Sequence, residues 1–103
     1  MTEQNVKVEH FSKKGKHETF ELKDEDGKLI QKFVFQFPGV RKTQELIDGA
    51  KNVAGAVVTK DYHEALMKHV IVEPKVSWEY FDEHEGYRRV MDAADSFLGD
   101  LLR

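Results

Sequence analysis

Two segments near the start of the chain show the period-two pattern of a half-buried strand. Residues 17–22 alternate, and residues 29–37 resume an extended pattern in which Phe33, Phe35 and Phe37 fall on one face. Residues 24–27 between them end in the Asp-Gly pair typical of hairpin turns, and Pro38-Gly39 ends the second strand. Because two strands alone are marginally stable in water, the hairpin must pack on helices or pair with another chain.

After Gly39 the apolar residues recur at the three- and four-residue spacing of helices. A first helix is expected over residues 42–54, ending at Gly55, with these residues on one side: Leu46, Ile47, Ala50 and Val53. A second helix is expected to begin at Asp61, because Glu64 stands three residues later in a capping-box arrangement. The apolar face of this second helix comprises Tyr62, Ala65, Leu66, His69 and Val70.

The last third contains a break and two further helical segments. Glu73-Pro74 is the break, since the residue before a proline is pushed out of the helical region. Ser77 can cap a short helical turn over residues 78–82. Residues 87–102 then carry a wide apolar stripe made of Tyr87, Val90, Met91, Ala94, Phe97, Leu98, Leu101 and Leu102. The pattern therefore predicts an α+β fold, an N-terminal β-hairpin followed by three to four α-helices, with a strongly amphipathic C-terminal helix.

Length and composition indicate one small globular domain. At 103 residues the chain is too short to divide into two cores, and we expect a flexible polar arm over 1–16 and a single α+β domain over 17–103. The sequence has no apolar run of membrane-spanning length and no cysteine, and because residues 1–10 lack an apolar region we do not expect them to be a signal peptide. The net charge is −3, and clustered lysines occur only in the N-terminal arm, which argues against a nucleic-acid-binding protein.

Candidate chemical motifs fail on spacing. His63-Glu64 is followed by His69 at six residues instead of the four that a zinc-protease helix needs, so we expect a surface His63 and a partly buried His69. Residues 24–27 lack the ligand spacing of a calcium loop. Residues 82–85 combine carboxylates with a histidine but have no accompanying nucleophile. We therefore expect a non-enzymatic protein without a cofactor or a bound metal.

Trp78, Tyr80 and Phe81 form the candidate partner-binding site. Successive side chains of a short helical turn project about 100° apart, so the three rings cannot share one buried face. We expect one or two of them to be exposed, where aromatic side chains favour contact with a partner. The alternative is that all three fill the small core.

Residues 35–102 resemble the short tail assembly chaperones of siphovirus-type bacteriophages and prophages of Gram-positive bacteria. The resemblance is carried by packing and capping patterns in four segments: Phe35-Gln36-Phe37-Pro38-Gly39, Asp61-Tyr62-His63-Glu64-Ala65-Leu66-Met67, Val72-Glu73-Pro74-Lys75-Val76-Ser77-Trp78-Glu79-Tyr80-Phe81 and Met91-Asp92-Ala93-Ala94-Asp95-Ser96-Phe97-Leu98. It covers about two-thirds of the chain.

The resemblance implies a protein that binds the tape measure protein and the tail tube protein (the major tail protein) and keeps them soluble during tail assembly. It implies action in the host bacterial cytoplasm, absence from the mature virion, and no catalytic residues. The orphan hairpin and the wide stripe of 87–102 also favour a homo-oligomer. Two other functions fit the pattern: a structural tail-completion or head–tail connector subunit, and, on the basic arm alone, a small nucleic-acid-binding regulator.

Overall fold

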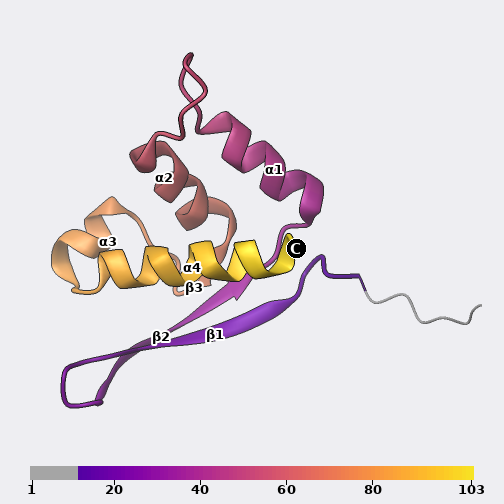
Figure 1. Ribbon diagram of the computed structural model, residues 1–103. Helices are drawn as coiled ribbons and strands as arrows, with labels where there is room; N and C mark the ends of the chain where they lie inside the picture. The colour runs from indigo at the N-terminus through magenta and orange to yellow at the C-terminus, as the bar shows by residue number, and fades with distance from the viewer. Residues whose placement is uncertain (1–11) are drawn as a thin grey trace, which may run out of the picture.

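The computed structural model describes residues 12–103, which form a three-stranded sheet and four helices (Figure 1). Of the arm expected over residues 1–16, residues 1–11 lie outside the described residues. Its last residues run beside the end of the second strand, where Gly15 N donates to Phe37 O at 2.7 Å and Phe37 N donates to Lys16 O at 2.8 Å. These two backbone hydrogen bonds attach the beginning of the described chain to the sheet.

The sheet is antiparallel throughout, with strand order β1-β2-β3. β1 (His17–Lys23) and β2 (Leu29–Gln36) form the predicted hairpin, in which Phe20 pairs with Phe33. Asp24 Oδ1 shapes its turn by accepting hydrogen bonds from the backbone N–H groups of Asp26 and Lys28, each at 2.9 Å.

The third strand, β3 (Ile71–Glu73), was not predicted. It pairs with β2 at Phe35 and Ile71. Its apolar residues continue directly from the preceding helix, and three residues are too few to display a period of two. The predicted break at Glu73-Pro74 thus ends a short strand, whereas the helix has already ended at His69.

Four helices complete the fold: α1 (Val40–Gly49), α2 (Thr59–His69), α3 (Trp78–Glu83) and α4 (Tyr87–Leu101). In Figure 1, α4 runs along the sheet, and α1 and α2 lie beyond it. Within the described chain the α+β class, the hairpin and the amphipathic last helix are therefore as the sequence predicts.

Two predicted boundaries in the middle of the chain are wrong. α1 ends at Gly49 and not at 54, so Val53 does not lie on its apolar face; this residue is 109% exposed. α2 begins two residues before Asp61, and its N-cap residue Val58 makes no side-chain capping hydrogen bond. Asp61 therefore lies in the first turn, where its negative charge complements the positive end of the helix.

The core lies between the sheet and the helices. All three phenylalanines of the predicted strand face are buried, and Phe35 and Phe37 pack on Phe97 of α4, with ring centroids 5.7 and 6.5 Å apart. α4 buries the middle of its predicted stripe: Val90, Met91, Ala94, Phe97 and Leu98. The hairpin was expected either to pack on helices or to pair with another chain, and here the helices of the same chain cover it.

Candidate functional site

The aromatic cluster, Trp78, Tyr80 and Phe81, lies on α3. This short helix begins as the sequence predicts, because Ser77 Oγ accepts a hydrogen bond from Tyr80 N at 3.1 Å. The capping bond fixes the backbone at the start of the cluster and thereby the directions in which its three rings project.

Each ring of the aromatic cluster has neighbours within the fold. Trp78 and Phe81 both pack on Tyr87, with ring centroids 5.8 and 5.5 Å apart. Tyr80 meets Phe33 of β2 edge-on, with ring centroids 6.4 Å apart, and Phe81 edge-on at 5.0 Å. All three residues are half-buried, so the prediction that one or two are exposed is wrong. Ring contacts to Phe33 of β2 and to Tyr87 of α4 account for the partial burial of the cluster. The partner-binding role of the aromatic cluster stays a prediction.

The two histidines of α2 are placed opposite to expectation. His63 is 8% exposed, and its Nδ1 shares a hydrogen bond with Tyr87 Oη, whereas His69 is exposed. Burial lowers the pKa of His63, and the positive charge of Arg88 lowers this pKa further. The spacing of His63 to the buried Leu66 and to the residues that follow it is that of a helix face, so the pattern itself could have identified this side chain.

A second polar contact joins α2 to α4. Tyr62 Oη donates a hydrogen bond to Asp95 Oδ1 at 2.6 Å. Burial raises the pKa of the Tyr62 hydroxyl, and the hydrogen bond to the Asp95 carboxylate raises it further. Asp95 is exposed and lies off the apolar stripe, but its carboxylate also links α4 to α2.

Two other classes of feature can be stated for the described residues. Between residues 12 and 103, no three His, Cys, Asp or Glu side chains are grouped so that they could hold a metal ion. The same part of the chain has no helix with the length and apolarity needed to cross a membrane.

In the part of the chain that the structure describes, the most exposed large apolar side chain, Val53, lies in a loop that the sequence did not predict. We call residues 53–57, Val53-Ala54-Gly55-Ala56-Val57, the apolar tip; all five are exposed, Val53 fully and Val57 at 45%. They lie in the connection between α1 and α2, which projects away from the rest of the fold in Figure 1. Assigning Val53 to a helix and Gly55 to its end hid this loop, although Asn52 and Gly55 are typical turn residues.

The backbone of the apolar tip is held by hydrogen bonds. Asn52 Oδ1 accepts from Ala54 N at 2.9 Å and from Ala56 N at 3.1 Å, and Asn52 N donates to Ala56 O at 2.8 Å. At the base, Val58 N donates to Ala50 O at 2.8 Å. The loop therefore presents apolar side chains to solvent on an ordered backbone, which lowers the entropic cost of binding.

Comparisons with protein-family models, with curated proteins and with solved structures find no match for this chain.

Proposed function

We propose that the protein is a tail assembly chaperone of a long-tailed bacteriophage or prophage. In this role it binds the tape measure protein and the tail tube protein in the host bacterial cytoplasm, keeps them soluble, and is absent from the mature virion. The proposal assigns the chain no catalytic activity, no cofactor and no metal. The observation that carries it is the apolar tip, whose five consecutive apolar residues lie outside the core.

The segments that carry the resemblance pack together, which supports the proposal because they belong to one folded unit. Phe35, in the first segment, contacts Phe97 in the last, with ring centroids 5.7 Å apart. Tyr62, in the second segment, donates its hydrogen bond to Asp95, also in the last. The third segment follows Ile71, which pairs with Phe35 in the sheet. The four segments that carry the resemblance thus lie in the sheet and in the helices that pack around it.

The apolar tip suits the binding of an aggregation-prone client. Because its side chains are already in solvent, they can cover apolar client residues without any opening of the core. Burying one valine side chain completely contributes about 1.5 kcal/mol or more, so a single tip binds weakly and releases easily. Self-association, which we propose as well, would present several tips to one long client and raise the avidity.

The aromatic cluster supplies a second proposed contact. Its half-buried rings keep part of their surface accessible, so Trp78, Tyr80 or Phe81 could pack against a client while remaining anchored in the fold. A substitution here will affect both stability and binding, whereas a substitution of the exposed Val53 in the apolar tip should affect binding alone.

Co-expression tests the proposed function. The chain is produced together with the tape measure protein of the same genome, and the two should co-purify with the tape measure protein in the soluble fraction. An unrelated aggregation-prone protein is the control for general solubilisation. A tape measure protein that aggregates equally with and without the chain would contradict the proposal.

Analysis of purified phage particles separates the chaperone from a structural subunit. A chaperone is absent from particles by mass spectrometry, whereas a tail-completion or connector protein is present in them at a fixed copy number. Detection at such a copy number would replace the chaperone by the structural alternative.

A further inference from the structure

A second surface feature lies at the junction between β2 and α1, away from the aromatic cluster. It is a pocket of about 570 Å³ whose apolar lining residues are Phe37, Pro38 and Val40. Val40 is 54% exposed although it is apolar. The pocket therefore offers an apolar floor that residues 12–103 leave accessible.

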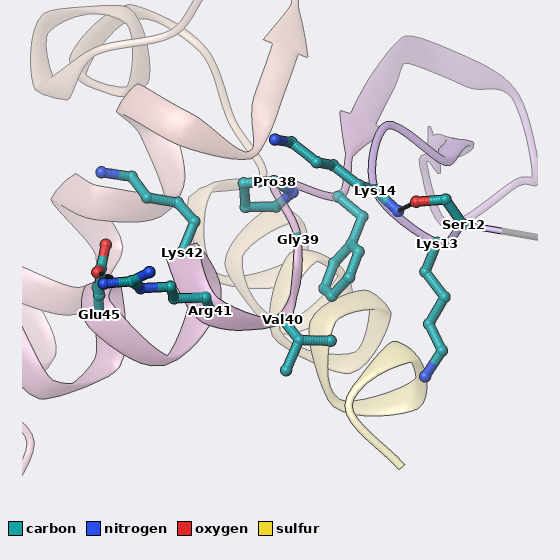
Figure 2. A pocket seen from close by; sticks show the side chains of 10 residues that line it. Ser12, Lys13, Lys14, Pro38, Gly39, Val40, Arg41, Lys42 and Glu45 are labelled. Atoms are coloured by element: carbon teal, nitrogen blue, oxygen red, sulfur yellow. Dashed lines mark hydrogen bonds and ion pairs between the residues drawn. The ribbon is translucent and has the colours of Figure 1, made fainter.

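The rim of this pocket is basic. Four positively charged side chains from two separate segments line it: Lys13, Lys14, Arg41 and Lys42. Figure 2 shows Lys14 and Lys42 extending along one side of the segment around Pro38, while Lys13 extends on the other side. Two of the four have partners in the fold, because Lys13 Nζ donates to Leu101 O at 2.9 Å and Arg41 pairs with Glu45 at 3.4 Å. Between residues 12 and 103, no side-chain hydrogen bond or ion pair holds the amines of Lys14 and Lys42, so these side chains are best placed to meet a ligand.

The position of the basic residues is unfavourable for the helix itself. Gly39 is the N-cap of α1 and offers no side chain for capping, and the first turn contains no acidic residue. Arg41 and Lys42 instead add positive charge at the positive end of the helix, where cations are destabilising. A local arrangement that opposes stability is expected where a surface serves binding.

We propose that this basic pocket binds an acidic peptide segment of a partner protein, with one apolar side chain of that segment seated on Pro38 and Val40. The carboxylates of the segment would pair with Lys14 and Lys42 and face the uncapped end of α1. The inference does not depend on the proposed chaperone function.

Charge and chemistry favour a peptide over a nucleic acid. A protein that binds a phosphate backbone needs a run of cations, but it does not need an apolar floor. Here the pocket includes Glu45 on its rim, and the chain as a whole carries a net charge of −3. An acidic segment with an apolar side chain matches both the rim and the floor.

Fluorescence anisotropy with defined peptides tests the proposal on the full chain. The probe is a fluorescein-labelled peptide with one phenylalanine flanked on both sides by glutamates. Two matched peptides replace either the phenylalanine by alanine or the glutamates by glutamines, and single-stranded DNA and inorganic phosphate serve as competitors. We expect the first peptide to bind most tightly, and its affinity to fall as the salt concentration is raised. In NMR spectra of the protein, this peptide should shift the backbone amide signals of Gly39, Arg41 and Lys42.

Two variants localise the binding. Lys14→Glu combined with Lys42→Glu should weaken binding about tenfold, because two attractive pairs become repulsive. Lys28→Glu combined with Lys60→Glu makes the same change in net charge elsewhere and should leave the affinity within about twofold. Val40→Ser should remove the advantage of phenylalanine over alanine in the peptide.

Lys42→Glu alone gives an independent readout of folding. It places a carboxylate at the N-terminal end of α1 and should raise the melting temperature while it weakens peptide binding. A loss of binding through unfolding would move both quantities in the same direction, and such a result would overturn the proposal.

Three other results would also overturn it. These are absence of peptide binding, equal weakening by the control pair, and DNA or phosphate displacing the peptide at equal charge concentration. The pocket would instead belong to an interface with a second copy of the chain if two results came together: the wild type binds no peptide, and the Lys14→Glu, Lys42→Glu variant changes its oligomeric state. This outcome too would contradict the proposal.

Discussion

Replacing Gly86 with alanine is expected to destabilise the fold for two reasons, the backbone conformation of this residue and a close contact with Leu22. Gly86 is the N-cap of α4 and has φ 101° and ψ 7°, in the left-handed region. A Cβ atom there would lie 2.4 Å from Leu22 Cδ2. Because Leu22 is only 1% exposed and belongs to the core, it cannot move aside without disturbing its neighbours.

The two contributions can be estimated separately. The left-handed conformation costs a residue with a Cβ about 1–2 kcal/mol. Overpacking against Leu22 adds about 1–3 kcal/mol. Gly86→Ala should therefore lower the free energy of unfolding by about 2–5 kcal/mol. Gly55→Ala is the matched control, because Gly55 has φ 86° and a Cβ added there would meet no atom within 4 Å, so that only the first contribution applies.

Urea unfolding followed by far-ultraviolet circular dichroism measures both variants. Gly86→Ala should have the lower midpoint of the two, with slopes that stay equal to that of the wild type. Equal losses in the two variants would refute the reasoning, since they would show that the contact with Leu22 carries no cost.

Three further predictions follow from the packing and the polar contacts. Leu98→Ala should cost about 2–5 kcal/mol because this side chain is 1% exposed; Asp95→Ala should cost only about 1 kcal/mol, for the hydrogen bond from Tyr62. Equal urea midpoints would mean that the buried face of α4 is misassigned. Thr43→Val should raise the free energy of unfolding by about 1–2 kcal/mol, because the buried Thr43 Oγ1 has no hydrogen-bond partner within residues 12–103; a loss of stability would contradict this. Finally, the depressed pKa of His63 means that the unfolded chain takes up its proton first, so stability should fall as the pH is lowered below about 6.5. His63→Gln should flatten this dependence, and an unchanged pH profile would argue against it.

The elements with long, regular patterns could be predicted from the sequence. The alternation of Phe33 and Phe35 with Val34 and Gln36 identified β2 and its buried face, because side chains on one face of a strand recur at every second residue. The stripe of α4 spans four turns and predicted both the helix and its five buried residues. Ser77 predicted the start of α3 through a single capping contact.

The remainder depends on contacts between segments that are distant in the sequence. β3 exists because β2 offers an edge beside Ile71, and no local pattern shows that edge. The aromatic cluster is half-buried because Tyr87 and Phe33 lie beside α3, which the geometry of one turn does not show. The apolar tip was missed for a local reason, because helical spacing appeared to continue through Val53.

We propose above that the apolar tip, residues 53–57, holds the tape measure protein in solution. Val53→Asp tests it most directly, with Leu29→Asp as the matched control, since Leu29 is an exposed leucine (45%) at the start of β2. Both variants should melt within a few degrees of the wild type, as surface substitutions usually do.

The decisive measurement is the fraction of co-expressed tape measure protein that remains in the supernatant. We predict that Val53→Asp lowers this fraction sharply while Leu29→Asp leaves it at the wild-type level. An undiminished soluble fraction with a folded Val53→Asp variant would contradict the proposed role of the apolar tip.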